Sequence, residues 1–203
     1  MGRGLALLAA ALLAFQSAGA QSLGDLLKLL DGLSSGSAEQ NARTEERPAV
    51  TAKSLTGKWT YAEPAARYDG DNLVGTLGVS ALESILPALY SKAGLTAGKG
   101  SVTFSAPDVF SARIGSYNVT GNYRMVSPDG TVVLSATVRN VSGMLHGSVV
   151  IDGDTLTLVL DAAAAAALVE RVAPKASSND YFKILKSVFD SYPGVKFGCK
   201  LTR

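Results

Sequence analysis

The most regular feature of the chain is an alternation of apolar and polar residues that begins near Gly100 and continues to Leu160. A period of two is typical of strands that bury one face and expose the other. Short segments rich in glycine, proline, aspartate or asparagine interrupt the alternation, as tight reversals require. Strands joined by short reversals pair as antiparallel neighbours, so this region predicts an up-and-down meander.

Two further alternating stretches, one at each end of the domain, bring the total to about eight strands. The first starts at Ser54, and we expect Glu63-Pro64 to end it because proline has no backbone donor. The last runs from Val195 to Leu201 and places Cys199 on its buried face. Pairing of the last strand with the first would close the sheet and leave no free edge.

Trp59 is the only tryptophan in the chain, and it lies on the expected buried face of the first strand together with Leu55, Gly57 and Tyr61. A large indole at this position predicts a structural plug for one end of the barrel. Gly57, one step back on the same face, should leave a gap in which another backbone or ring lies close. We therefore assign Gly57 and Trp59 to structure.

Helical spacing replaces the alternation in three parts of the domain. After the first strand, the apolar residues between Leu82 and Ala93 predict a helix with a kink at Pro87. Before the last strand, Asp161 caps an alanine-rich helix, and a second helix starts near Asp180. The predicted fold class is mainly β with helices: an up-and-down antiparallel barrel, one helix after strand 1 and a helical pair before the last strand.

The first fifty residues have a different character. Residues 1–20 combine Arg3 with a short apolar run and the small residues Ala18-Gly19-Ala20, which predicts a secretory signal peptide. Residues 21–33 predict a short amphipathic helix, residues 34–52 a flexible linker, and residues 53–203 the barrel domain. We therefore expect the mature chain to be exported. The apolar run is not followed by a cysteine, so an N-terminal lipoprotein is not expected.

The composition argues against several classes of function. The formal net charge of +2 arises from 19 basic and 17 acidic residues, a balance too even for nucleic-acid binding. One cysteine permits neither an intramolecular disulfide nor a cysteine metal cluster. One histidine lowers the expectation of an enzyme, and none of the common catalytic spacings is present. We therefore predict no catalytic residues, no metal site and no cofactor.

Three polar features have simpler explanations than chemistry. His146 lies on a strand without an acidic neighbour in sequence, so a hydrogen-bonded or solvated side chain is expected. Asp152-Gly153-Asp154 fits a hairpin turn better than a calcium loop, which needs more oxygen ligands. Asp69, Asp71 and Asn72 either cap the following segment or bind a polar ligand, and capping is the favoured interpretation.

The order of these elements resembles a known family. Gly57-Lys58-Trp59 is similar to the Gly-x-Trp motif of lipocalins, in which the tryptophan closes one end of the barrel under a basic side chain from the final strand. That resemblance implies such a role for Lys200 or Arg203. Residues 53–201 more closely resemble the lipocalin-like exported proteins of the DUF4923 group from Bacteroidales-type bacteria. The resemblance implies a lipocalin-like fold and no activity, together with a location in the periplasm or outer envelope of a Gram-negative bacterium. The helical pair departs from a simple lipocalin.

Two functions remain compatible with this architecture. The first is a non-catalytic module, expected to be a monomer, that binds a small apolar or amphipathic molecule inside the barrel. The candidate lining residues for this site are Phe104, Phe110, Tyr123, Leu134 and Phe197. The second is a structural or partner-binding envelope protein with a filled barrel, which makes weak membrane or protein contacts through residues 22–33. An enzyme that uses only carboxylates and tyrosines is a third, less favoured hypothesis.

Overall fold

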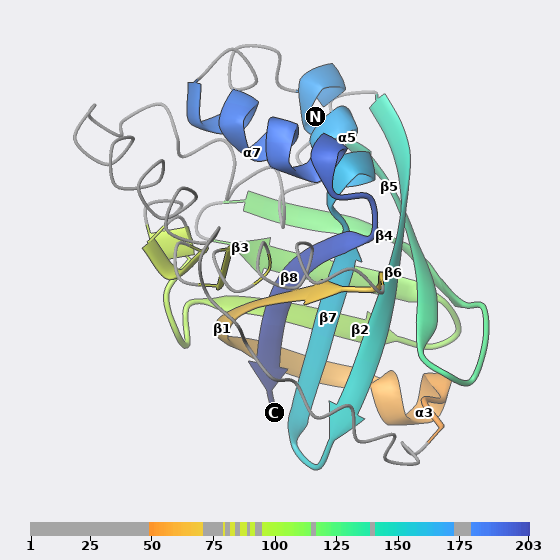
Figure 1. The fold of residues 1–203 in the computed structure, drawn as a ribbon. Coiled ribbons are helices and arrows are strands. Elements are labelled where there is room, and N and C mark those ends of the chain that lie inside the picture. Colours follow the sequence, from red (N-terminus) through yellow and green to blue (C-terminus); the bar gives the residue numbers. More distant parts are fainter. Residues whose placement is uncertain are drawn as a thin grey trace.

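Eight antiparallel strands form a closed barrel, and their order around the barrel is their order in the chain (Figure 1). This computed structural model describes residues 49–70, 79, 82–83, 86–88, 90–91, 95–114, 117–138, 141–172 and 180–203. The strands are β1 (Gly57–Tyr68), β2 (Gly100–Ser105), β3 (Val109–Ile114), β4 (Tyr117–Met125), β5 (Thr131–Val138), β6 (Val141–Asp152), β7 (Thr155–Asp161) and β8 (Val195–Thr202). The predicted fold class is confirmed, including the pairing of the last strand with the first.

The chain enters the barrel through a short helix that the alternation did not predict. Helix α3 (Ala52–Leu55) begins with a capping box in which Thr51 and Ser54 bond reciprocally. Ser54 was expected to begin the first strand, and this prediction is wrong because the two hydroxyl side chains satisfy the backbone of a helical turn. Val50, within the expected linker, is already buried in the core.

Gly57 lies where the chain passes from helix α3 into strand β1. Its φ is +132°, which an L side chain rarely adopts. A Cβ added there would meet nothing within 4 Å. The expectation that Gly57 makes room for a close ring or backbone is therefore wrong, and the glycine is required for its backbone conformation.

Strand β1 continues beyond the proline that was expected to end it. It pairs with β8 from Thr60 to Tyr68, with an irregularity between Tyr61 and Glu63, and Pro64 lies opposite Cys199. It pairs with β2 only from Gly57 to Thr60. Proline is tolerated on a strand edge, since no ladder bond on that side needs its missing N–H group. The prediction failed because the sequence does not show that β2 leaves β1 before Pro64.

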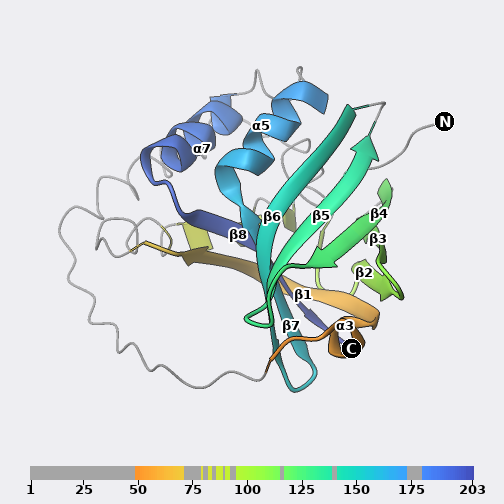
Figure 2. The same ribbon diagram turned by 90° about the vertical axis from the view of Figure 1, so that its right-hand side faces the viewer.

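Helices cover both ends of the barrel. Helices α5 (Ala162–Val172) and α7 (Asp180–Ser191) form the expected pair and lie over one end, whereas α3 and the C-terminus lie at the other (Figures 1 and 2). Asp161 accepts a hydrogen bond from the Ala164 N–H at 2.7 Å, which caps α5 as predicted. Phe189 of α7 stacks on Phe197 of β8 with ring centroids 5.2 Å apart. The helical pair therefore contributes side chains to the same core as the strands.

The helix expected after the first strand is described in part. Residues 79, 82–83, 86–88 and 90–91 are helical. Leu82, Leu86 and Tyr90 are buried, as the predicted apolar stripe requires. Residues 84, 85 and 89, which are needed to define a kink at Pro87, lie outside the described residues, as do residues 1–48, Asp71 and Asn72. Within the part of the chain that is described, no helix is long and apolar enough to cross a membrane.

Candidate functional site

Trp59 closes the end of the barrel that carries α3. Its side chain is fully buried, and the indole N–H donates to the Leu55 carbonyl at 2.8 Å. The Arg203 guanidinium carbon lies 4.0 Å from the centroid of the indole ring. Arg203 also donates to the Ser54 carbonyl at 3.0 Å, so it joins the end of β8 to α3. Of the two candidates for the basic side chain, the structure selects Arg203, and Lys200 instead pairs with Glu63 at 2.7 Å.

The five candidate lining residues all point into the barrel, where they contact other side chains. The Phe104 ring lies 5.1 Å from Tyr123 in an edge-to-face arrangement and 6.5 Å from Phe110. Leu134 is the cross-strand partner of Tyr123, and Phe197 packs on α7. Their exposed fractions lie between 1% and 6%. The interior around them is therefore packed, and their predicted binding role stays a prediction.

The Tyr123 hydroxyl is a polar group that lies among these apolar side chains. It is buried and has no hydrogen-bond partner among the described residues. An unsatisfied buried donor costs about 1–3 kcal/mol relative to a satisfied one. The hydroxyl could therefore bond to a polar group of a molecule that enters the barrel, although the surrounding rings would have to move to admit it.

A pocket of about 550 Å³ lies where β1 leaves β2. We call it the seam pocket. One wall is the segment of β1 and β8 around the Glu63–Lys200 ion pair, and the others come from the helical residues 83, 87 and 91 and from the turn before β2. Its lining residues are Tyr61, Ala62, Glu63, Pro64, Glu83, Pro87, Ser91, Leu95, Thr96, Ala97 and Lys200. The sequence analysis did not predict a binding site from these residues, and the proline within an alternating strand was the signal that could have located the open edge.

Close packing beneath the seam pocket fixes the position of its floor. The Tyr61 ring lies 6.0 Å from the Tyr90 ring, and the Tyr90 hydroxyl donates to the Gly198 carbonyl at 2.9 Å. A Cβ on Gly100 would come within 2.4 Å of Leu95 and 3.3 Å of Tyr61. Glycine at position 100 therefore lets the Leu95 side chain lie directly against the backbone of β2. Burial, followed by the nearby Cys199 and Glu63, raises the pKa of Tyr61, so its hydroxyl is neutral at ordinary pH.

A second pocket among the described residues, of about 960 Å³, lies against β3 to β6 and is lined mainly by hydroxyl, amide and small side chains. Arg171 of α5 is its charged lining residue. Neither this pocket nor the seam pocket is lined by any of the five predicted interior residues. The two pockets therefore offer binding surfaces that are distinct from the packed interior.

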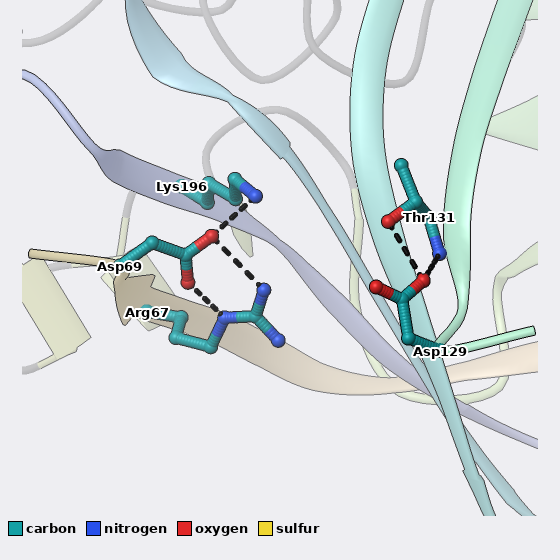
Figure 3. A network of polar contacts seen from close by, with 5 residues as sticks. All are labelled: Arg67, Asp69, Asp129, Thr131 and Lys196. Atoms are coloured by element: carbon teal, nitrogen blue, oxygen red, sulfur yellow. Dashed lines mark hydrogen bonds and ion pairs between the residues drawn. The ribbon is translucent and has the colours of Figure 1, made fainter. Parts of the chain in front are cut away.

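Two carboxylates organise the polar contacts drawn in Figure 3. Asp69 accepts from Arg67 at 2.6 Å and also pairs with Lys196. Burial raises the pKa of Asp69, but hydrogen bonds from the two cations outweigh this effect and lower it overall. For Asp69, the structure thus shows ion pairing within the protein. Whether Asp71 and Asn72 share the expected cluster lies outside the described residues.

Asp129 holds the turn between β4 and β5. It accepts from the Thr131 N–H at 2.9 Å and the Thr131 hydroxyl at 2.8 Å, and it also bonds Ser127. The Ser127 and Thr131 hydrogen bonds lower the pKa of Asp129 to about 2. The Asp152-Gly153-Asp154 segment is confirmed as a hairpin turn, since Asp152 pairs with Thr155 and Gly153 has a φ of +55°.

The histidine and the cysteine of the chain do not lie in surroundings that would activate them for catalysis. His146 is exposed on the outer face of β6, opposite Val133. Cys199 is buried, and burial raises the pKa of its thiol to about 12. Among the described residues, no three His, Cys, Asp or Glu side chains are grouped so that they could hold a metal ion.

Comparison with protein families gives one match, to the family described as Lipocalin-like domain (DUF4923), over residues 26–203. The chain belongs to this family. The match begins within the expected amphipathic helix and includes the expected linker. The region that the family shares is therefore longer than the strands of the barrel. No curated protein and no solved structure matches the chain. A lipocalin-like barrel suggests a small-molecule-binding module. Among the described residues, the seam pocket and the pocket against β3 to β6 are surfaces available for such a molecule.

Proposed function

We propose that this lipocalin-like domain is an exported, non-catalytic module that binds a small amphipathic molecule in the seam pocket. The observation that carries the proposal is the pocket itself, whose volume of about 550 Å³ lies within the range of about 300–1,000 Å³ common for ligand sites. Apolar surface comes from Pro64, Pro87 and Leu95, and polar groups come from Ser91 and Thr96. An amphipathic molecule matches this mixture.

The topology explains why the pocket lies at the seam. Beyond Thr60, β1 has β8 on one side and no β2 partner on the other. The Gly98 N–H donates to the Tyr61 carbonyl at 2.9 Å and so replaces the first missing ladder bond. Pro64 needs no replacement for an N–H that it lacks. The wall of the barrel is thus open here without unsatisfied bonds at these two positions.

A site inside the barrel, as predicted from the sequence, would require Phe104, Phe110 and Tyr123 to separate. The seam pocket requires no such rearrangement. Export is supported by the signal-like sequence at residues 1–20, and the non-catalytic character by the single histidine and the lack of catalytic spacings.

The test is native mass spectrometry of protein purified without denaturation from its own cells. Ala97 lines the pocket and is exposed, so Ala97→Trp should fill it without disturbing the core. Ala163→Trp places the same side chain on an exposed position of α5 and serves as the control. Wild type and Ala163→Trp should retain the same small molecule, and Ala97→Trp should lose it. A bare wild-type protein, or an Ala97→Trp variant that keeps the molecule, would contradict the proposal.

The packed interior favours a second candidate, a structural or partner-binding envelope protein. In that case the sequence at residues 22–33 makes the contact and the barrel is a rigid support. Removing residues 21–48 separates the two functions and spares Val50, which bonds Pro128 and lies against Gly130. Loss of envelope or partner association with unchanged small-molecule binding would favour the second candidate.

A further inference from the structure

The charges around the seam pocket are unequal. Its ionisable lining residues are the acids Glu63 and Glu83 and the base Lys200. Lys200 donates to one carboxylate oxygen of Glu63 at 2.7 Å, and both side chains are about half exposed. Glu83 is exposed on the opposite wall and has no ion pair with any described residue. The pocket therefore carries one negative charge that the described part of the protein does not neutralise.

The uncharged lining residues also restrict the class of ligand that fits the seam pocket. Pro64, Pro87 and Leu95 supply apolar surface, and the floor is the neutral ring of Tyr61. Ser91 and Thr96 add hydroxyl groups that can both donate and accept hydrogen bonds. A fully hydrated ion would leave this apolar surface uncovered, and a plain hydrocarbon would leave Glu83 without a partner.

We propose that the seam pocket selects small organic amines, in which a protonated amino group lies beside Glu83 and an apolar body covers Pro64, Pro87 and Leu95. This inference rests on the proposed function, since it names the class of molecule bound at the same site. The cation would complete the one carboxylate of the pocket that has no ion pair with a described residue, since Lys200 already pairs with Glu63. A ligand carboxylate would instead meet two acids and compete with Glu63 for Lys200.

Three six-carbon probes with different head groups test this preference. Hexylamine and hexanol carry a positive and a neutral head group on the same apolar chain, and hexanoate carries a negative head group on a chain one carbon shorter. Binding is followed by the shifts of backbone amide NMR signals during titration of the mature chain. The amides of Tyr61, Leu95, Thr96 and Ala97 should respond if the probes enter the seam pocket.

Hexylamine should bind about three- to fivefold more tightly than hexanol, because a partly exposed ion pair contributes no more than that. Hexanoate should bind most weakly, and added salt should reduce the difference between the amine and the alcohol. Glu83→Gln should bring the amine to within about twofold of the alcohol. Lys200→Met should increase the preference for the amine by releasing Glu63. Glu170→Gln, which removes the same charge from an exposed position of α5, should leave the preference unchanged.

The outcomes separate this inference from the proposed function. Equal binding of hexylamine and hexanol, or an amine preference that survives in Glu83→Gln, overturns the charge selection and leaves the pocket as a ligand site. Failure of all three probes to shift the four pocket amides overturns both. A preference for hexanoate would show that Lys200, and not Glu83, decides the charge of the ligand.

Discussion

Arg203 offers a direct test of how the Trp59 end of the barrel is held together. Arg203→Ala removes a guanidinium group 4.0 Å from the indole centroid and a hydrogen bond of 3.0 Å to Ser54. An exposed cation–π contact contributes about 0.5–1 kcal/mol, and a hydrogen bond about 0.5–1.5 kcal/mol net. We therefore expect the free energy of unfolding to fall by about 1–2 kcal/mol. Arg203→Lys should lose roughly half as much, because an ammonium group keeps the charge without the planar contact.

The assay is equilibrium unfolding in urea, followed by far-UV circular dichroism and by the fluorescence of the only tryptophan. Arg113→Ala on the exposed face of β3 is the control and should change stability by less than about 0.5 kcal/mol. A double-mutant cycle with Trp59→Phe then isolates the pairwise contact, with circular dichroism as the common signal. If Arg203→Ala destabilises the protein no more than Arg113→Ala does, the Arg203 contacts with Trp59 and Ser54 do not stabilise this end of the barrel.

Three further predictions concern buried or bonded polar groups. Tyr123→Phe should leave stability unchanged or raise it by up to about 1 kcal/mol in urea unfolding, since it deletes an unsatisfied hydroxyl; a loss of more than about 1 kcal/mol would mean that the hydroxyl has a partner. Cys199, with a pKa raised to about 12, should resist a thiol-specific disulfide reagent at pH near 8 in the native protein and react fully in urea; rapid native reaction would contradict its burial. The pKa of Asp129 falls from 3.8 to about 2 on folding. The stability that its ionised carboxylate adds to the fold is therefore fully present above the unfolded pKa and is lost as the pH falls through the folded pKa. Asp129→Asn should therefore flatten the acid limb of stability against pH below about 4, and an unchanged acid limb would argue against the Thr131 and Ser127 contacts.

The strands and their connections could be predicted from sequence because the necessary information is local. Alternation places Val102, Phe104 and Phe110 on the buried face, and residues such as Gly153 mark the reversals. Antiparallel neighbours joined by short turns then leave few arrangements open. The closure of β1 on β8 followed from the need to cover two edges, and the structure confirms it.

The capping box of Thr51 and Ser54 is local, but the alternation that follows it hid the helical turn. The other errors arose where a distant partner decides the local structure. Pro64 continues a strand because only one neighbour remains. Val133 and Val159 lie on the face opposite the core and are nevertheless buried, which a simple alternation does not predict. In each case the burial or pairing depends on residues far away in the chain.

The candidate site, too, could be predicted from the sequence only in part. Trp59 and a basic partner near the end of the chain were predicted from a resemblance in sequence, and the structure assigns the partner to Arg203. The seam pocket could not be predicted, since it depends on where β2 separates from β1 and on how closely Leu95 approaches Gly100. Those are consequences of register, and a single sequence does not reveal the register of β1 against two different partners.

The most direct test of the account is a crystal structure of the protein purified without denaturation from its own cells. The account predicts electron density for a small molecule between β1 and the helical residues 83, 87 and 91, in contact with Tyr61 and Leu95. Density inside the barrel, with Phe104 and Phe110 moved apart to admit it, would contradict the seam pocket as the ligand site.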